Sequence, residues 1–276
     1  MIAQEQEQTR AAWNTIAAGY DEFVTAPGMP VAEDALRHAG LQPGMRLLDV
    51  ATGSGALSIP AARLGAHVLA ADLSPRMIER LTARARAEGL SNLEARVMDG
   101  HALELEDNTF NISASQFGVM LFPDLPRALR EMARVTRPGG RVLMVVYATP
   151  ATIDFLSFFM RAMHAAVPGF TGLPTDPPPL PFQVSDPEVL RQELAKAGLK
   201  DIRVEAGAEK LELQSGKQLW DWVTNSNPIA TMLIADLTEE QKTTVVQSLD
   251  DQLRARAGGD GAAILTNPVY IGIGTK

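Results

Sequence analysis

The sequence predicts an α/β protein with a doubly wound, Rossmann-like sheet of seven strands, the last of them antiparallel. Short apolar runs alternate with helical stretches between residues 45 and 147, the first two runs each end in a carboxylate, and a glycine-rich turn follows the first. Alternation of this kind is typical of βαβ units on a parallel sheet. Such sheets bind ligands at the carboxyl ends of their strands, so function is expected along that edge.

The core elements follow from the apolar runs and from residues that start or stop helices. Ser74 and Pro75 read as a helix cap followed by proline at a first helical position, and Gly89 stops that helix. The sequence RPGG at 137–140 is expected to end a later helix. We expect strands at 45–51, 67–71, 93–98, 110–115 and 141–147, and helices at 56–64, 75–88 and 125–135.

Further helices are expected on both sides of this core. Apolar side chains spaced three or four apart predict an amphipathic helix over 9–23, which the Pro/Gly stretch 26–30 ends before a short helix at 31–39. Residues 1–44 are therefore predicted to form a helical lid, and 45–276 one α/β core with a helical insertion before the last strand. Its second half is expected to hold helices at 153–166, 187–197 and within 216–256, a proline-rich loop at 168–181, and strands at 202–204 and 263–273.

Composition narrows the class of protein. The 276 residues are 46% hydrophobic, which suffices for a full core and excludes disorder as the main state. The net charge of −8 argues against a nucleic-acid partner, and the lack of cysteine excludes disulfides, a cysteine nucleophile and thiolate metal sites. The first ten residues lack the features of a secretory signal, and no apolar run approaches the ~18 residues of a membrane span. We therefore expect a cytoplasmic protein without membrane insertion.

Three carboxylates at successive strand ends point to a ligand. Asp49 precedes the turn formed by Gly53 and Gly55, where a carboxylate would repel a pyrophosphate and attract a cation. Asp72 ends the next strand, where it can accept hydrogen bonds from ribose hydroxyls, and Asp99 can accept from an adenine amino group. A ligand with an ammonium, a ribose and an adenine but no phosphate fits S-adenosylmethionine (SAM) better than NAD, FAD or ATP.

Each of these features also has a structural explanation. Asp72 alone could cap a helix, Asp99 alone could belong to a turn, and glycine turns are often plain loops. Their joint placement at three strand ends favours the ligand site. A dehydrogenase is disfavoured by Asp49 and by Ser58, which stands where the third glycine of the G-x-G-x-x-G fingerprint would be.

The residues from 46 to 147 resemble a known family. The run is similar to class I SAM-dependent methyltransferases of the small-molecule branch that includes ubiquinone and menaquinone biosynthesis. The matching segments are LLDVATGSG (47–55), AADLSPRMI (70–78), VMDGHALELEDNTFNISASQFGVMLFPD (97–124) and LREMARVTRPGGRV (129–142). The likeness extends weakly to WNTIAAGYDEF and to SDPEVLRQELAKAGLKDIRVE (185–205). These motifs specify fold and cofactor and say little about the methyl acceptor.

The resemblance implies a role for each matching position. The methionine end of SAM would lie against Asp49, Ala51, Gly53 and Ser54. The ribose would lie on Asp72, and the adenine beside Leu73, Met77, Asp99, Gly100 and His101. Ser115 and Gln116 would lie close to the sulfonium, and Tyr20 would close over the cofactor. Two positions depart from the family: Ala51 replaces a usual glycine and Asn111 a usual aspartate, and either change could lower the affinity for SAM.

The catalytic chemistry is less defined by the sequence. Tyr147 and His164 are the candidates for a general base, although His164 also reads as a core histidine. No His, Asp or Glu pair has metal-ligand spacing, so no metal is expected. The methyl acceptor is expected to be small and apolar or aromatic, in a pocket formed by the lid and by segments 151–181 and 214–260, with Phe158, Met163 and Trp222 among its walls.

Several alternatives stay open at this stage. Oxygen, nitrogen and carbon acceptors are all compatible with the sequence. A protein of the same fold could bind SAM and catalyse another reaction, or could serve as a binding subunit without turnover. The intact Asp49, Gly53, Asp72 and Asp99 argue against that last alternative. The oligomeric state is open, and a homodimer is compatible with the sequence.

Overall fold

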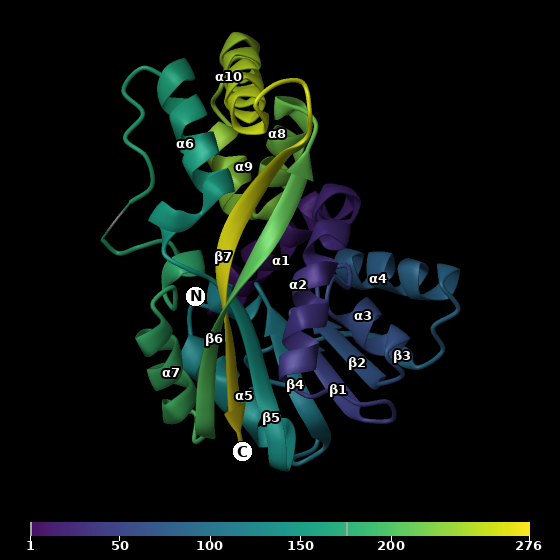
Figure 1. Ribbon diagram of the computed structural model, residues 1–276. Coiled ribbons are helices and arrows are strands. Elements are labelled where there is room, and N and C mark those ends of the chain that lie inside the picture. The colour runs from purple at the N-terminus through teal and green to yellow at the C-terminus, as the bar shows by residue number, and fades with distance from the viewer. Residues whose placement is uncertain (1, 175) are drawn as a thin grey trace.

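The computed structural model describes residues 2–174 and 176–276, and it confirms the predicted fold class. Seven strands form one sheet in the order β3-β2-β1-β4-β5-β7-β6 (Figure 1). Strands β1 to β5 are parallel, and β7 runs antiparallel between β5 and β6. The strand order reverses between β1 and β4, so the switch point at which such sheets bind ligands lies there.

The bounds of the elements are as follows. The strands are β1 (Arg46–Val50), β2 (His67–Asp72), β3 (Leu93–Val97), β4 (Phe110–Gln116), β5 (Thr136–Tyr147), β6 (Lys200–Leu213) and β7 (Ala263–Thr275). The helices are α1 (Ile2–Gly19), the π-helical turn η1 (Tyr20–Val24), α2 (Thr25–His38), α3 (Ser58–Arg63), α4 (Pro75–Ala87), α5 (Leu125–Val135), α6 (Asp154–Ala166), α7 (Pro187–Lys196), α8 (Gly216–Ser226), α9 (Pro228–Ile234) and α10 (Glu239–Ala257).

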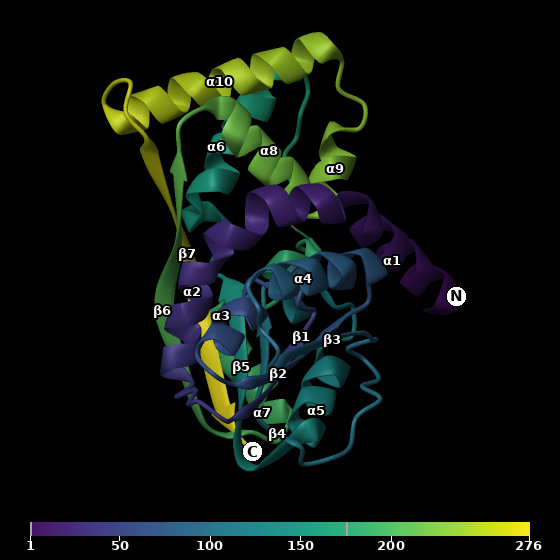
Figure 2. The ribbon, with the colours of Figure 1, turned by 90° about the vertical axis from the view of Figure 1, so that its right-hand side faces the viewer.

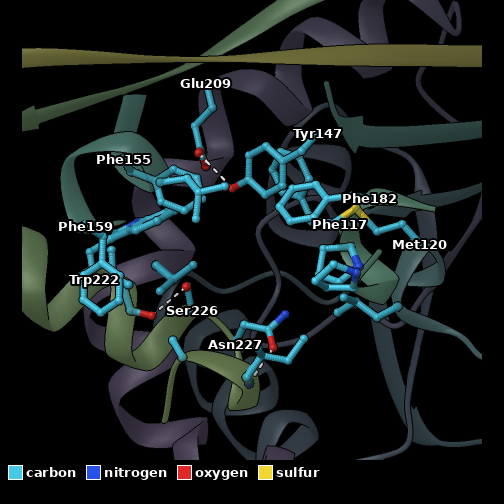
Figure 3. A pocket seen from close by; sticks show the side chains of 18 of the residues that line it. Phe117, Met120, Tyr147, Phe155, Phe159, Phe182, Glu209, Trp222, Ser226 and Asn227 are labelled. Atoms are coloured by element: carbon cyan, nitrogen blue, oxygen red, sulfur yellow. Dashed lines mark hydrogen bonds between the residues drawn. The ribbon is translucent and has the colours of Figure 1, made fainter. Parts of the chain in front are cut away.

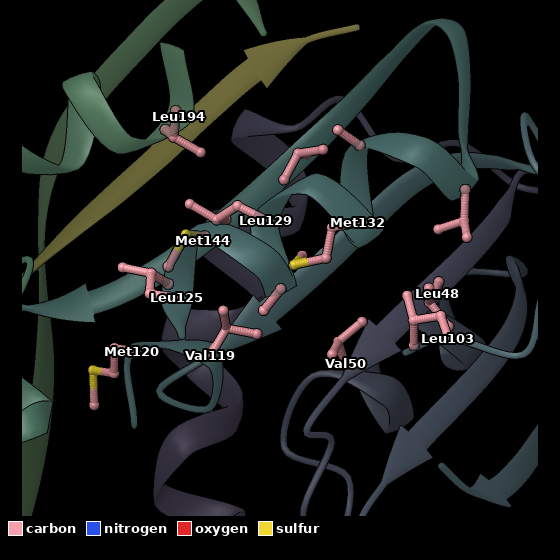
Figure 4. Packing of buried hydrophobic residues seen from close by; sticks show 14 of the residues in the cluster. Leu48, Val50, Leu103, Val119, Met120, Leu125, Leu129, Met132, Met144 and Leu194 are labelled. Atoms are coloured by element: carbon pink, nitrogen blue, oxygen red, sulfur yellow. The ribbon is translucent and has the colours of Figure 1, made fainter. Parts of the chain in front are cut away.

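Helices cover both faces of the sheet, which explains why its central strands β1 and β4 are almost continuously buried. On β5, Val142 and Met144 pack with Leu129 and Met132 of α5 (Figure 4). The alternate residues, such as Leu143, face the opposite side, where α2 and α3 pack. Burial on both faces fixes the register of these strands, because a slip of one residue would exchange the two faces.

The two last strands extend beyond the sheet. β5 pairs with β7 only as far as Val269, whereas β6 and β7 stay paired to Leu213 and Ala263. This two-stranded ribbon reaches a layer formed by α6, α8, α9 and α10 (Figures 1 and 2). Leu211 and Leu265 of the ribbon are buried with Phe158 and Phe159 of α6 in a hydrophobic cluster of that layer. The ribbon therefore connects the sheet to the helical insertion.

Three boundaries differ from the sequence prediction. The strand expected at 202–204 is the longer β6, whose remainder alternates polar and apolar residues as a half-buried strand does. The Pro/Gly stretch 26–30 does not end the first helix: α1 continues through η1 into α2. Pro27 lies in the first turn of α2, where proline is tolerated, although Pro30 lies inside the helix. The RPGG segment at 137–140 likewise belongs to β5 rather than to a turn before it.

Other local predictions are confirmed. Helix α5 has the predicted bounds, and Ser74 caps α4 by accepting a hydrogen bond from the backbone of Met77. Strand β7 is antiparallel, and three helices lie between β6 and β7 as the predicted insertion. No helix among residues 2–174 and 176–276 is both long and apolar enough to cross a membrane.

Candidate active site

The N-terminal helices close over the carboxyl ends of the strands. Figure 2 shows α1 between α4 and the pair α8 and α9. Gln6 Nε2 donates to Asp99 Oδ2 at 2.8 Å, and Ser74 Oγ donates to Asn14 Oδ1 at 2.7 Å. Thr25 and Ser54 share a hydrogen bond between their buried hydroxyls. These contacts join one helical segment to several turns of the sheet edge.

Asp49 lies at the centre of this edge, and its side chain is only 1% exposed. Its Oδ2 accepts hydrogen bonds from Thr52 Oγ1 and Ser58 Oγ, both at 2.7 Å. Its Oδ1 is buried and has no hydrogen-bond partner among the described residues. Burial raises the pKa of Asp49 to about 6, although the two hydroxyl donors oppose that shift. A carboxylate in this state lacks one donor, which a bound ammonium group would supply.

Asp72 ends β2 and contacts the glycine turn. Its Oδ2 accepts from the backbone N–H of Gly53 at 2.9 Å, and its Oδ1 from the N–H of Ser74 at 2.8 Å. Burial raises the pKa of Asp72 to about 6. Each carboxylate oxygen has a further lone pair, so the side chain can still accept from two ribose hydroxyls.

The glycine turn is closely covered by an aromatic ring. Gly53 has a φ of +55°, and a Cβ built on it would lie 3.1 Å from Cε1 of Tyr20. Ala51 also has a positive φ, of 56°, and its methyl group packs so closely on Gly118 that a Cβ there would lie 2.6 Å away. The methyl group of Ala51 is thus accommodated beside the site by a glycine elsewhere.

Asp99 follows β3 and is engaged on both oxygens. Oδ1 accepts from the backbone N–H of His101 at 2.9 Å, and Oδ2 accepts from Gln6. The His101 ring packs against Phe122, with ring centres 4.5 Å apart. Gly100 is enclosed, since a Cβ there would lie within 2.9 Å of Phe122 and Val50. This turn is therefore rigid, and only Gln6 would have to move for Asp99 to meet a ligand.

Other predicted site residues have structural contacts. Ser115 Oγ donates to the Val50 carbonyl at 2.8 Å and accepts from the Val119 N–H at 3.0 Å, so it fixes the turn after β4. Gln116 Nε2 donates to the Gly28 carbonyl, while its buried Oε1 has no partner among the described residues.

Two of the positions predicted beside the adenine, Leu73 and Met77, lie along the α4 edge. Met77 is 1% exposed and packs with Ile16 and Ala17 under α1. Leu73, next to Asp72, is half-buried. Helix α1 therefore covers this side of the site as well.

Asn111 does not belong to the site. It is the second residue of β4, at the opposite end of the strands, where its Oδ1 accepts from the Arg46 N–H at 2.9 Å. The prediction that this departure from the family lowers the affinity for SAM therefore has no structural basis. In the sequence, Ser58 was notable only because it stands where the third glycine of a dinucleotide-binding fingerprint would be. In the structure, Ser58 is one of the two hydroxyl donors to Asp49.

A cavity lined by aromatic side chains adjoins the carboxylates (Figure 3). Tyr20 and Gln116 line it on the side of Asp49 and Asp72. Phe117 stacks on Tyr147 with ring centres 4.2 Å apart. Phe155 and Trp222 pack edge to face, with ring centres 4.7 Å apart. A lining that is mostly apolar and aromatic suits a small, largely apolar molecule.

A buried carboxylate in this cavity escaped the sequence analysis. Glu209 is 2% exposed, and its Oε2 accepts from Tyr147 Oη at 3.0 Å and from Asn267 Nδ2 at 3.2 Å. Burial raises the pKa of Glu209 to about 7, and burial together with this carboxylate raises the pKa of Tyr147 well above 10. The sequence does contain a pattern that indicates this burial, because Glu209 alternates with Leu211 and Leu213, which share the buried face of β6.

The structure corrects the prediction for His164. This side chain is exposed, and its Nδ1 lies 2.8 Å from the Met160 carbonyl, so it is neither a core histidine nor part of the cavity. Helix α6 turns Phe159 and Met163 inward, which leaves His164 on the solvent side. Phe158 and Met163 are also outside the cavity lining, in the core of the helical layer, whereas Trp222 lines the cavity as predicted.

In the part of the chain that the structure describes, no three His, Cys, Asp or Glu side chains gather in a way that could hold a metal ion.

Comparison with known proteins agrees with this geometry. Residues 48–144 match the family described as a methyltransferase domain. An uncharacterised protein of Mycobacterium tuberculosis is 38% identical over 158 residues, which are 57% of this chain and 54% of its own. A demethylmenaquinone methyltransferase of Corynebacterium urealyticum is 28% identical over 173 residues, 60% of this chain and 71% of its own. The chain thus spans about half the length of the mycobacterial relative.

The solved phosphoethanolamine N-methyltransferase 2 of Haemonchus contortus, in complex with SAM, has a TM-score of 0.58 at 19% identity, covering 95% of this chain and 57% of that one. At this identity the likeness shows the fold alone. The fold and the family match define a class I SAM-dependent methyltransferase domain. The sequence is also similar to a demethylmenaquinone methyltransferase, so the resemblance drawn from the motifs is confirmed.

The buried Asp49 predicts a specific pH dependence of stability. Its pKa is about 6 in the folded protein and 3.8 ordinarily, so the folded state binds more protons between these values. This contribution to the free energy of unfolding is present below pH 3.8 and is lost as the pH rises through 6. We expect Asp49→Asn to gain about 1–3 kcal/mol relative to the wild type between pH 4 and pH 7.

Urea unfolding of both proteins across this pH range measures the difference. Asp260→Asn, which changes a fully exposed carboxylate, is the matched control and should follow the wild type at every pH. A parallel pH dependence for Asp49→Asn and the wild type would contradict the burial argument.

Proposed function

We propose that this protein transfers a methyl group from SAM to a small apolar or aromatic molecule and releases S-adenosylhomocysteine. The observation that carries the proposal is the buried Asp49 Oδ1, which accepts from no donor among residues 2–174 and 176–276 and lies at the switch point of a methyltransferase-domain sheet. The ammonium group of SAM is a donor of the required charge. The adjoining aromatic cavity provides a separate place for the acceptor.

The residues present fit the rest of the cofactor. Asp72 would accept from the ribose hydroxyls, and Asp99 from the adenine amino group once Gln6 releases it. Leu73, Met77, Gly100 and His101 would border the adenine, and Ala51, Gly53 and Ser54 the methionine end. Tyr20 and Gln116 would separate cofactor from acceptor, and Ser115 would hold the turn that carries Gln116.

We infer that residues 1–44 act as a lid on the core formed by 45–276. The hydrogen bonds Gln6–Asp99, Asn14–Ser74 and Thr25–Ser54 hold it closed, and SAM can enter only when they open. Segments 151–181 and 214–260 would surround the acceptor, since about half of the residues that line the cavity belong to them. Closure excludes water from the site.

When bound, SAM supplies an already activated methyl group on a sulfonium. The protein's contribution is therefore alignment of the acceptor and exclusion of water. The rigid turns around Gly100 and Ser115 and the stacked ring of Tyr147 provide that alignment. A base is required only for an acceptor that must lose a proton.

Turnover of SAM tests the proposal directly. The purified protein is incubated with SAM and with phenols, quinones, amines and carboxylates in turn, and products are identified by mass. A product heavier by one methyl group, together with S-adenosylhomocysteine, is expected for at least one class. Binding of SAM without methylation of any class would instead favour a protein of this fold with another reaction.

Asp72 should govern the affinity for SAM. Charge-assisted hydrogen bonds contribute about 1.5–3 kcal/mol each, so Asp72→Ala should weaken binding tenfold or more, with the fold intact. Asp72→Asn, which keeps the volume, should give a smaller loss, and Asp260→Ala none. Calorimetric titration with SAM measures all three. Unchanged affinity in Asp72→Ala would remove this residue from the site.

The aromatic wall should govern the choice of acceptor. Phe155→Ala enlarges the cavity and should change the ratio of kcat/KM between small and large acceptors while the affinity for SAM stays constant. Phe158→Ala, on the same helix but outside the cavity, should leave that ratio unchanged and lower the free energy of unfolding by about 3–5 kcal/mol. Equal ratios in Phe155→Ala and the wild type would contradict the placement of the acceptor.

We also propose that the reaction needs no metal ion. Turnover after dialysis against EDTA should equal that of the untreated protein, because alignment and a carboxylate suffice for the chemistry. Lost activity that Mg²⁺ or another divalent cation restores would overturn this proposal.

A further inference from the structure

The acceptor cavity contains one carboxylate, Glu209, that binding of SAM leaves unused. We propose that Glu209 is the general base of this enzyme and accepts the proton of a hydroxyl group on an aromatic or enolic acceptor, which is methylated on oxygen. This inference rests on the proposed function and adds to it the chemical class of the acceptor.

The geometry leaves one carboxylate oxygen for a ligand. Both hydrogen bonds to Glu209 from the described residues, those of Tyr147 and Asn267, end on Oε2. Oε1 accepts none from them, and the side chain lines the cavity, as Figure 3 shows. Asn267 is itself oriented, because its Oδ1 accepts from the Phe155 N–H at 3.2 Å. The carboxylate is therefore held in place with one oxygen available.

The groups around Glu209 leave its charge uncompensated. Tyr147 faces it from β5, Asn267 from β7, and Tyr20 from η1, and all three are neutral at pH 7. Among the described residues, no Lys, Arg or His side chain forms an ion pair with the carboxylate, on which only burial, Tyr147 and Asn267 act. The neighbouring Lys210 is exposed on the other face of β6. A buried carboxylate without a cation is costly, so a ligand that donates to it is favoured.

A hydroxyl acceptor matches this site better than the other classes. A carboxylate acceptor would bring a second negative charge against Glu209. A protonated amine would pair with Glu209 but has no lone pair with which to attack. A phenol or enol is neutral, donates its O–H to Oε1, and fills the aromatic cavity with its ring.

The step balances with the groups already named. The acceptor oxygen forms a bond to the methyl carbon, the sulfur–carbon bond breaks, and sulfur keeps that electron pair as a neutral thioether. The O–H proton moves to Glu209 Oε1. A sulfonium and a carboxylate become two neutral groups, and the loss of charge is favourable in a cavity of low dielectric constant. Tyr147 is a positioning residue in this step, because its hydroxyl donates to the other oxygen.

Binding of a phenolic probe tests the proton transfer without turnover. 4-Nitrophenol is titrated at pH 8 into the protein saturated with S-adenosylhomocysteine, and proton uptake is measured by calorimetry in buffers of different ionisation enthalpy. The wild type should take up about one proton per bound nitrophenolate, since one proton is shared with Glu209. Glu209→Gln should take up close to none, and Glu212→Gln, at an exposed position of the same strand, should match the wild type.

Kinetics give a second measurement. With a phenolic acceptor, kcat should rise through pH 7 in the wild type and should fall about 10²–10⁴-fold in Glu209→Gln, with the KM for SAM unchanged. In Tyr147→Phe the rising limb should move to higher pH, because the lost hydrogen bond had lowered the pKa of Glu209. This second variant tests the proposal even where Glu209→Gln fails to fold.

The outcomes separate the two proposals. Failure of the wild type to bind SAM would overturn the proposed function. Binding of SAM without binding of 4-nitrophenol, equal proton uptake in Glu209→Gln and the wild type, or methylation of amines alone would overturn the role of Glu209 and leave methyl transfer standing. An unmoved pH profile in Tyr147→Phe would also overturn the role of Glu209, because the rising limb would then not report the titration of the carboxylate to which Tyr147 donates.

Discussion

Burial of negative charge without a matching cation is the constraint on which the rest of the structure depends. Asp49, Asp72 and Glu209 form no ion pair with any described residue, and burial raises the pKa of each. Folding keeps them only because hydroxyls, amides and backbone N–H groups donate to them. Such groups reduce stability in the absence of ligand, and they become favourable when a cation or a donor binds.

The topology brings these carboxylates to one region. Asp49 and Asp72 lie in the carboxyl-terminal parts of parallel strands, which end at the same edge of the sheet. Glu209 arrives differently, on the part of β6 that continues past the sheet with β7. The lid helices complete the burial, because without α1 and η1 the turns at Gly53 and Ser74 would face solvent. The positions of the buried carboxylates, of the helices that cover them and of the aromatic cavity thus all depend on the same arrangement of the chain.

The aromatic cavity and the carboxylates also have complementary roles. Stacked rings such as Phe117 and Tyr147 are stiff and exclude water, which strengthens every electrostatic interaction inside. The rings themselves form few directional bonds, so an acceptor would be oriented by the few polar groups among them. Trp222 contributes one further group of this kind, since its buried Nε1 has no partner among the described residues.

Local chemistry in the sequence was enough for the sheet and for the cofactor side of the site. The alternation of apolar runs with helices, the cap at Ser74 and the carboxylates at strand ends depend on neighbours within a few residues or on a general property of parallel sheets. These features are confirmed as structure, while the ligand roles of the carboxylates remain proposals.

Only the tertiary structure decided the acceptor side. The contacts of Glu209 with Tyr147 and Asn267 join residues about 60 positions apart in the chain, and they exist because β6 and β7 pair beyond the sheet. The exposure of His164 depends on which face of α6 meets the helical layer, and the continuity of α1 with α2 depends on the sheet edge beneath them. Such contacts follow from how distant elements pack, and a pattern read along the chain does not contain that information.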